Sequence, residues 1–229
     1  MLMPPTTTAV ATRNSRYEFP RSGADINSLA GSMELMGTRI SYARNVEIFG
    51  EGEPAEYLYK VVSGSVRSCK ILDDGRRQVT GFHMAGEIFG IELDEEHQFS
   101  AEAVNDAVVL VVKRSAIIGL AARDANIGGE LWAMTARELQ RVQDHMLVLG
   151  CMSAKQRLAT FLLHMALQSS GGNEIELPMS RQDIADYLGL TIETVSRTMT
   201  QLENEAAIGM PSSRRIVLRN RAALTTLNA

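Results

Sequence analysis

The chain has 229 residues, a hydrophobic content of 45% and a formal net charge of −4. This length suits two domains that each bury a core, and no stretch approaches the roughly 18 apolar residues of a membrane helix. The start Met-Leu-Met-Pro-Pro lacks the apolar core of a secretory signal, and Cys69 and Cys151 are far apart and need no disulfide, so we expect a cytoplasmic protein. The sequence has no phosphate-binding P-loop, no serine nucleophile elbow and no metal-spaced His/Glu set, which argues against an enzyme.

The first part of the chain predicts a β-rich domain at residues 25–125, after a mobile Thr- and Pro-containing tail at residues 1–24. Asp73-Asp74-Gly75 offers the positive φ angles of a tight hairpin. Short β-forming runs alternate with glycine-containing turns at the spacing of a sandwich or barrel. The runs lie at residues 57–62, 65–71 and 108–112.

Residues 126–150 predict one long amphipathic helix, because apolar residues recur mostly three and four apart without an intervening proline. Such a wide apolar face can pack on the β-rich domain alone or pair with the same helix of a second copy. We favour pairing, and therefore a homodimer. The residues expected at this dimer interface are Ile127, Leu131, Met134, Leu139, Val142, Met146 and Leu149.

Residues 151–229 predict a winged-helix domain. The long helix is interrupted at residues 150–152, and Ser153 with Gln156 restarts a helix by a capping-box arrangement. This interruption is the expected hinge between the two domains. The remaining expected elements are a loop at residues 169–173, a short strand at 174–179 and a β-hairpin at 208–218 with residues 211–213 at its tip.

Residues 180–202 predict two short amphipathic helices joined by a sharp turn, which is the sequence form of a helix-turn-helix. Ser180 with Asp183 predicts a capping box at the start of the first helix, and Thr191 is a fitting N-cap for the second. Gly189 permits the reversal between them. The apolar residues expected to pack the helices together are Val195, Met199 and Leu202 on the second helix and Ile184, Ala185 and Leu188 on the first.

The second of these helices carries a polar face that suits the edges of DNA bases. Arg197 can donate two parallel hydrogen bonds to guanine, and Glu193 can accept one from a cytosine or adenine amino group. Ser196 can bond several groups, and Ile192 can contact a thymine methyl. We therefore expect double-stranded DNA as the partner. The residues expected at the DNA backbone are Ser180, Arg181, Gln182, Thr191, Thr194, Arg214 and Arg215.

The charge balance of the second domain limits how such a surface is built. Residues 153–229 hold 8 basic and 7 acidic residues. The attraction for DNA must therefore come from local placement of basic groups, and we expect binding to be modest and sensitive to salt.

The run E-T-V-S-R at residues 193–197 resembles the recognition helix of the CRP/FNR family of bacterial regulators, in particular its FNR and FixK branches. Residues 50–66 resemble the β-roll opening of cyclic-nucleotide-binding-like domains, and the resemblance runs from about residue 40 onward. It implies an α+β fold with an N-terminal β-roll (a jelly roll), a long dimerisation helix and a C-terminal winged helix-turn-helix.

The same resemblance carries expectations about function. It implies that Glu193, Ser196 and Arg197 read TTGA-type half-sites of a palindrome. It also implies an activator that recruits RNA polymerase at promoters for low-oxygen respiration, denitrification or nitrogen fixation.

Cyclic-AMP-responsive members of that family hold the ribose with a glutamate and the cyclic phosphate with an Arg-Ser pair. Alignment on Gly90 and Ser100 puts Ile91 in place of the glutamate and Phe99 in place of the arginine. A buried phosphate without a guanidinium keeps most of its desolvation cost, so we expect no cyclic nucleotide.

Other cofactors lack their usual ligands as well. Two cysteines are too few for a four-cysteine iron–sulfur cluster, and isolated histidines are usually structural rather than ligands of haem. We therefore expect no cofactor and no metal. This is the FixK pattern, in which regulation acts on synthesis or turnover of the protein.

Two alternatives remain. One is a regulator of the same family that is gated by an unidentified ligand or by redox chemistry at Cys151, although an unreactive thiol is the simpler interpretation of this residue. The other is a nucleotide-binding regulatory module that never contacts DNA, which the missing phosphate ligands and the helix-turn-helix both oppose.

Overall fold

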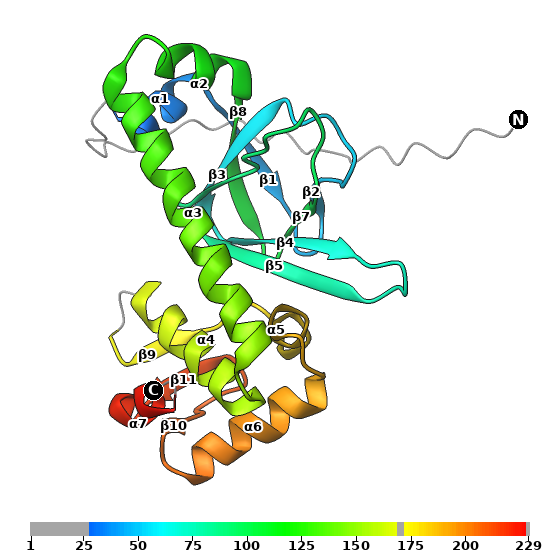
Figure 1. Ribbon diagram of the computed structural model, residues 1–229, viewed down its shortest axis with the longest axis vertical. Coiled ribbons are helices and arrows are strands. Elements are labelled where there is room, and N and C mark those ends of the chain that lie inside the picture. The colour runs from blue at the N-terminus through cyan, green and yellow to red at the C-terminus, as the bar shows by residue number, and fades with distance from the viewer. Residues whose placement is uncertain (1–27, 169–171, 228–229) are drawn as a thin grey trace, which may run out of the picture.

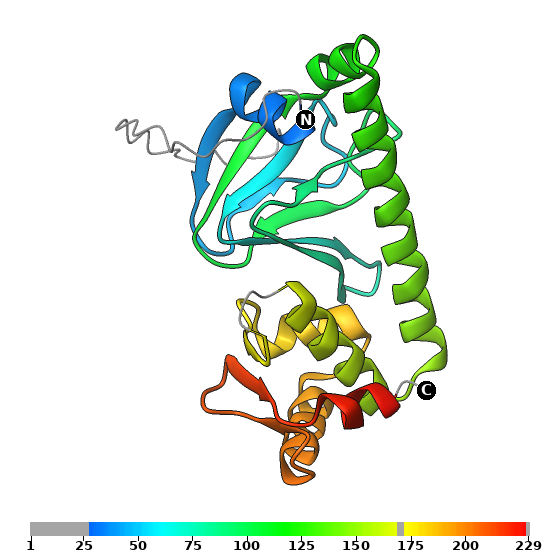
Figure 2. The ribbon, with the colours of Figure 1, turned by 90° about the vertical axis from the view of Figure 1, so that its left-hand side faces the viewer.

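A computed structural model describes residues 28–168 and 172–227. A β-rich domain lies at one end of the molecule and a mainly helical domain at the other, and the long helix α3 (Ala125–Cys151) runs alongside both (Figures 1 and 2). The expected mobile tail at residues 1–24 lies outside the described residues, as does part of the loop expected at 169–173. No helix of the described part is both long and apolar enough to cross a bilayer.

The β-rich domain is a roll of two antiparallel four-stranded sheets. Its elements are α1 (Leu29–Met36), β1 (Thr38–Tyr42), β2 (Glu47–Phe49), β3 (Tyr57–Ser63), β4 (Ser65–Ile71), β5 (Arg77–Met84), β6 (Ile88–Phe89), β7 (Ser100–Ala103), β8 (Ala107–Lys113) and α2 (Arg114–Ala121). The strand orders are β1-β8-β3-β6 and β2-β7-β4-β5. Alternation along β3, β4 and β8 buries Val61, Val66 and Val109 in one core. The three strand runs predicted from the sequence are thereby confirmed.

The turn between β4 and β5 forms the predicted tight hairpin, but with a different backbone. Ile71 pairs with Arg77, and the Gly75 N–H donates to Leu72 O at 2.8 Å. Of the three turn residues expected to supply positive φ angles, only Gly75 does so, with φ of 81°. The expectation for the two aspartates was wrong, because a tight turn followed by one left-handed glycine already reverses the chain.

Helix α3 confirms the predicted long helix, and its two halves differ in what they contact. The first half packs on the roll, where Ile127 is 1% exposed in a cluster with Met33 and Ile117. Leu131 and Met134 are partly buried against the same cluster. The prediction that Ile127 faces a second copy was therefore wrong, because its own β-roll already covers it.

The second domain is the predicted winged helix. Its elements are α4 (Ala154–Gln168), β9 (Glu174–Glu176), α5 (Arg181–Leu188), α6 (Ile192–Asn204), β10 (Ile208–Gly209), β11 (Arg215–Leu218) and α7 (Arg221–Thr226). The small sheet has the order β10-β11-β9, and its hairpin β10–β11 is the wing. Strand β9 is shorter than the expected run to residue 179, because Pro178 has no N–H to extend a ladder.

The two domains share an apolar cluster. Cys69, Val79 and Phe82 of the roll belong to the same buried cluster as Leu162 and Tyr187 of the winged helix. Helix α5 lies against strand β5 in this junction, and Figure 1 shows it directly beneath the β4–β5 pair. The position of the helix-turn-helix is thus tied to the roll as well as to α3.

Candidate DNA-binding site

Helix α5 begins with the predicted capping box. The backbone N–H and the Oγ of Ser180 donate to Asp183 Oδ2 at 2.9 and 2.7 Å, and the Asp183 N–H donates to Ser180 Oγ at 3.1 Å. These bonds satisfy donors that a free helix start leaves without partners. The first helix of the motif therefore begins at a fixed residue.

The turn that follows also has the predicted chemistry. Gly189 adopts a left-handed conformation with φ of 61°, and the Thr194 N–H donates to Thr191 Oγ1 at 3.2 Å at the start of α6. The six apolar residues predicted to pack the helices together are all buried. Helix α6 is therefore held with one face in the core and the opposite face outward.

The outward face of α6 carries the predicted base-reading residues. Glu193, Arg197 and Ile192 are exposed, and Ser196 is partly exposed. Within residues 28–168 and 172–227, neither the Glu193 nor the Arg197 side chain forms an ion pair. Both keep their hydrogen-bonding capacity for an external partner. Further along the same helix, the sequence analysis missed three exposed polar residues, Thr200, Gln201 and Asn204, although the same helical spacing could have found them.

The residues predicted at the DNA backbone differ in availability. The Ser180 hydroxyl already serves the capping box, so a role in donating to a phosphate is not supported by its geometry. Arg181 is partly buried, with Nη2 at 3.9 Å from Met210 Sδ, and Gln182 Nε2 donates to Asp186 Oδ1 at 2.6 Å. Thr191 is exposed and Thr194 partly so, beside the N-terminus of α6 where an anion is favoured.

The wing supplies two more basic residues. Arg214 and Arg215 are both exposed, and Ser212 Oγ accepts from the Arg215 N–H at 3.1 Å in the turn between the strands. The Arg215 guanidinium also pairs with Glu174 of β9. Because both partners are exposed, this pair is weak and can open toward a phosphate.

Arg157 holds the motif to the end of α3, and the sequence analysis missed it. Its guanidinium donates to the backbone oxygens of Leu149, Met152 and Leu188 at 2.8, 2.9 and 2.9 Å. It therefore binds the C-terminal ends of α3 and α5, where unpaired carbonyls favour a cation.

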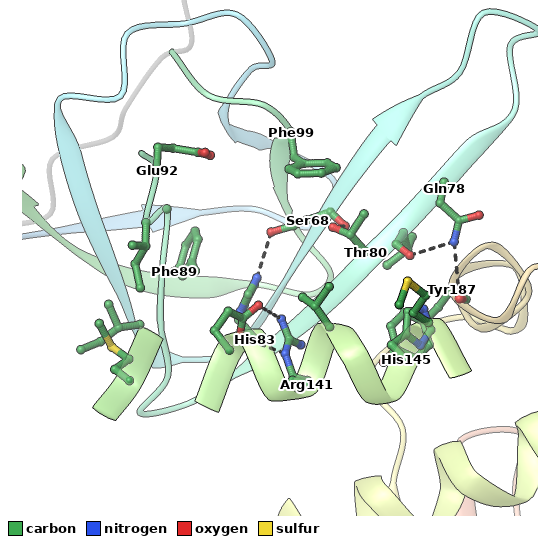
Figure 3. Close-up of a pocket in the computed structure, with 18 of the residues that line it drawn as sticks. Ser68, Gln78, Thr80, His83, Phe89, Glu92, Phe99, Arg141, His145 and Tyr187 are labelled. Carbon is green, nitrogen blue, oxygen red and sulfur yellow. Dashed lines mark hydrogen bonds and ion pairs between the residues drawn. The ribbon is translucent and has the colours of Figure 1, made fainter. Parts of the chain in front are cut away.

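The β-roll contains a cavity of about 470 Å³ beside α3. Apolar side chains such as Phe89 and Phe99 dominate its lining, with Ser68, His83 and Arg141 among the polar groups (Figure 3). His83 Nε2 lies 2.8 Å from Ser68 Oγ. Burial, with a smaller contribution from the Arg141 charge, lowers the pKa of His83 to about 3, so its imidazole is neutral at physiological pH.

These residues do not fit a cyclic nucleotide phosphate. Ile91 and Phe99 line the cavity where the glutamate and arginine were sought. Among the described lining residues, Arg141 is the one guanidinium, and it already donates to Glu138 Oε2 from Nε at 3.0 Å. It also packs over β5 so closely that a Cβ on Gly81 would lie 2.8 Å from Arg141 Nη2. The cavity thus offers a phosphate one guanidinium among its described lining residues, and that guanidinium is already paired with Glu138.

The two cysteines differ in exposure. Cys69 is buried, and burial raises its thiol pKa to about 11, which leaves it protonated and unreactive. Cys151 is exposed at the end of α3. No cluster of three or more His, Cys, Asp or Glu side chains suited to a metal occurs in the part that the structure describes.

A cyclic-nucleotide-type roll joined to a helix-turn-helix defines the class of this protein as a transcription regulator. Residues 39–124 match the cyclic nucleotide-binding domain model, and residues 156–227 match the Crp-like helix-turn-helix domain model. The chain belongs to the CRP/FNR family of transcription regulators and is of the FixK type.

Named relatives give the extent of this similarity. The chain is 50% identical over 199 residues to the nitrogen fixation regulation protein FixK of Azorhizobium caulinodans, which covers 85% of this chain and 80% of the relative. FixK of Rhizobium meliloti is 39% identical over 199 residues, covering 86% of this chain and 91% of the relative. The solved structure of FixK2 from Bradyrhizobium japonicum matches with a TM-score of 0.82 and 50% identity over 85% of this chain and 98% of that one. These relatives are regulators and not enzymes.

Proposed function

We propose that this chain is a homodimeric activator of transcription that binds a palindrome of TTGA-like half-sites without a bound effector. The single observation that carries the proposal is the outward face of α6, where Glu193 and Arg197 are exposed on a helix whose other face is locked into the core. Exposed groups that can read a base pair, held on a rigid element, are what direct readout in the major groove requires.

Dimerisation is supported by an exposed apolar seam on α3. Trp132, Leu139 and Met146 recur every seven residues and are 77%, 59% and 65% exposed. Val142, which is 53% exposed, and Leu149, which is partly exposed, follow Leu139 and Met146 by three residues, at the second apolar position of a heptad. Such a seam is typical of a helix that pairs with its twin, and exposed apolar residues in a row mark an interface. Trp132 was not among the interface residues predicted from the sequence, whereas Leu139, Val142, Met146 and Leu149 were.

Pairing of two parallel α3 helices places both winged helices at the same end of the dimer. Two recognition helices related by a twofold axis read two half-sites about one helical turn apart, which is the symmetry of a palindrome. In this arrangement Arg197 contacts guanine, Glu193 accepts from a base amino group, and Ser196 and Ile192 complete the readout. Thr191, Thr194, Gln182, Arg181, Arg214 and Arg215 face the backbone.

Independence from an effector is supported by the cavity of the roll, where Arg141 is bonded to Glu138 and His83 to Ser68, while His145 Nε2 is the buried lining atom that the described residues leave without a partner. The rival function is a regulator of the same family that an unidentified ligand or the oxidation of Cys151 controls. The exposure of the Cys151 thiol at the link between the domains supports this second candidate, because an exposed thiol can be oxidised.

The relatives' names support the biological role, since two of them are nitrogen fixation regulation proteins. We propose that RNA polymerase is the second partner, at promoters for low-oxygen respiration, denitrification or nitrogen fixation, in the cytoplasm.

Selection of preferred sites from random duplexes, with purified protein and no added ligand, tests the proposal. We expect enrichment of a palindrome with TTGA-like halves, and a dimer by sedimentation at the same protein concentration. A monomer, or equal recovery of random and palindromic duplexes, would falsify the proposed function.

A further inference from the structure

Helix α5, the first helix of the DNA-binding motif, is attached to the molecule at both ends. Its C-terminal end is bound by Arg157, which also binds the end of α3. Its N-terminal end is paired with arginines of strands β4 and β5 of the roll, and Figure 1 shows α5 beneath these two strands. Two separate attachments fix a rigid body more fully than one, because a single attachment leaves a rotation free.

The N-terminal attachment is made by two arginines of the roll. Arg67 of β4 is 5% exposed, and its Nη1 donates to Asp183 Oδ1 at 3.0 Å. The same guanidinium pairs with Glu102 within the roll and donates to Asn45 Oδ1 at 3.3 Å. Arg67 is therefore held by the roll before it meets α5.

Arg77 of β5 contacts two carboxylates of α5. Its Nε donates to Asp186 Oδ2 at 2.8 Å, and its Nη2 donates to Asp183 Oδ1 at 2.6 Å. Both aspartates are largely shielded from solvent. Shielded ion pairs with several hydrogen bonds have fixed geometry, and removing one partner leaves a charge without compensation.

Asp183 connects this contact to the DNA-binding motif itself. Its Oδ2 accepts the capping-box bonds from Ser180, while its Oδ1 accepts from both arginines. Burial raises the pKa of this carboxyl, but the hydrogen bonds from Ser180 and the charges of Arg67 and Arg77 outweigh burial and hold the pKa below its usual value. One carboxylate thus caps α5 and anchors it to the roll.

Aromatic packing surrounds the ion pairs. The Tyr187 ring of α5 lies 4.1 Å from the His145 ring of α3 and 5.3 Å from the Phe82 ring of β5. Gln78 Nε2 donates to Tyr187 O at 3.4 Å. The apolar contacts resist separation of the domains, whereas the directional bonds of the arginines resist sliding and rotation.

We propose that Arg67 and Arg77 are positioning residues for DNA recognition, which hold each helix-turn-helix at one orientation on its own β-roll and so set the spacing between the two half-sites that a dimer reads. This inference rests on the proposed dimer and its palindrome. The polypeptide link from α3 to α4 has only Met152 and Ser153 between the helices, and it fixes position but not rotation. The arginines act through α5 and contact no base.

Arg77→Glu is the test variant, because it places a third acidic group beside Asp183 and Asp186. Arg67 and Asp183 are unsuited, since Arg67 supports the interior of the roll and Asp183 caps α5. The matched control is Arg76→Glu, which changes the charge equally one residue away. Arg76 is exposed, and the side-chain hydrogen bond and ion pair that its guanidinium forms within the described residues are with Asp74 in its own turn. Rescue is tested with Arg77→Glu combined with Asp186→Arg.

The first readout is affinity for duplexes with the selected half-sites at the preferred spacing, at spacings changed by one or two base pairs, and for a duplex with a single half-site. If Arg77→Glu lowers the fraction of dimers in which both helix-turn-helices are docked to about a tenth, affinity at the preferred spacing falls about tenfold. Affinity for the single half-site stays within about twofold, because α6 itself is unchanged. A structural defect in the reading helix would instead lower all affinities alike.

The second readout is the distance between spin labels at Asp73→Cys and Ser213→Cys in a Cys151→Ser background, which needs no DNA. Cys69 is buried and stays unlabelled. We expect a narrow distance distribution for the parent chain and for Arg76→Glu, a broad one for Arg77→Glu, and a narrow one again for the double exchange.

The outcomes separate this inference from the proposed function. A parent chain that prefers one spacing, with Arg77→Glu showing the same preference and the same narrow distances, overturns the positioning role alone. A parent chain with no preference among spacings overturns the proposed palindrome and, with it, the role in setting spacing. A flattened spacing profile that the double exchange restores supports the inference.

Discussion

The outer face of α6 and the cavity of the β-roll differ in what their polar groups bond. On α6, the carboxylate of Glu193 and the guanidinium of Arg197 are exposed and free of ion pairs within the described residues. In the cavity, Arg141 is bonded to Glu138, and His83 is bonded to Ser68 (Figure 3). The first surface keeps its binding capacity for an outside partner, whereas in the cavity the Arg141 and His83 side chains are bonded within the chain and His145 Nε2 is left without a partner among the described residues.

The β-roll has the family's fold without the charged residues with which cyclic-AMP-responsive members bind their ligand. The roll keeps the strands and turns of a cyclic-nucleotide-binding domain. Apolar Ile91 and Phe99 line its cavity at the positions where charged ligands would be needed. Membership of the fold family therefore does not by itself show that the cavity binds the family's ligand.

The largest loss of DNA affinity is expected from a change in the apolar seam of α3, which would bring the two winged helices of a dimer together. Leu139→Glu puts a charge into a paired α3, and we expect dissociation to monomers and at least a hundredfold loss of affinity for the palindrome, about 3 kcal/mol. Sedimentation and fluorescence anisotropy measure the two effects. Leu167→Glu is the control, because Leu167 is a similarly exposed leucine on α4, outside the seam. A dimer that survives Leu139→Glu would contradict the assigned interface.

The next largest effect distinguishes contacts to bases from contacts to phosphates within the winged helix. Arg197→Ala should cost about 1 to 3 kcal/mol of discrimination at one guanine of each half-site, because two parallel hydrogen bonds to that base are lost. Arg215→Ala should weaken all sequences similarly and flatten the dependence on salt, since it removes only a phosphate contact. Affinities for every single-base variant at several salt concentrations measure both. Equal, sequence-blind losses for the two variants would contradict the roles assigned to them.

Much of the fold and the outward face of α6 could be predicted from the sequence, because the signals for them are local. The capping pair Ser180 and Asp183, the left-handed Gly189 and the helical period of Val195 and Met199 all act within a few residues, and the structure has them as predicted. The β-roll strands were equally visible, because alternation and glycine turns are local.

Contacts between distant segments could not be predicted in this way. Arg67 and Asp183 are separated by 116 positions, and the carbonyls that Arg157 binds lie at the ends of two different helices, α3 and α5. Periodicity also identifies the apolar face of α3 without telling what covers it. For that reason Ile127 was assigned to a partner although the roll buries it, and Trp132 was missed on the exposed seam.

A smaller effect is expected from pH, through His83 of the cavity. Its folded-state pKa is about 3 against an ordinary 6.5, so the unfolded chain binds a proton first as pH falls, and stability is lost from pH 6.5 downward. At pH 5.5 this amounts to about 1.4 kcal/mol. Urea unfolding at pH 7.5 and 5.5, at one protein concentration, measures it.

His83→Gln removes this proton site and should reduce the loss of stability on acidification, although His145 and His164, whose pKa values burial also lowers, keep part of it. DNA affinity of the variant at pH 7.5 should equal that of the parent chain. An unchanged pH dependence would contradict the titration assigned to His83. Weaker DNA binding without loss of stability would show that His83 serves DNA binding instead of the fold.

The smallest effect is expected from cyclic AMP itself. A ligand that binds the folded state stabilises it in proportion to the logarithm of its concentration over the dissociation constant. The only guanidinium among the described lining residues is already bonded to Glu138, and the Phe99 ring lies 5.9 Å from Lys70 Nζ in an interaction of its own. We therefore expect no change in the unfolding midpoint or in DNA affinity at millimolar nucleotide.

The double variant Ile91→Glu with Phe99→Arg restores the two missing groups and should gain a measurable shift in the unfolding midpoint. A shift already present in the parent chain would mean that the cavity still binds an effector and that the contrast between the two surfaces is false.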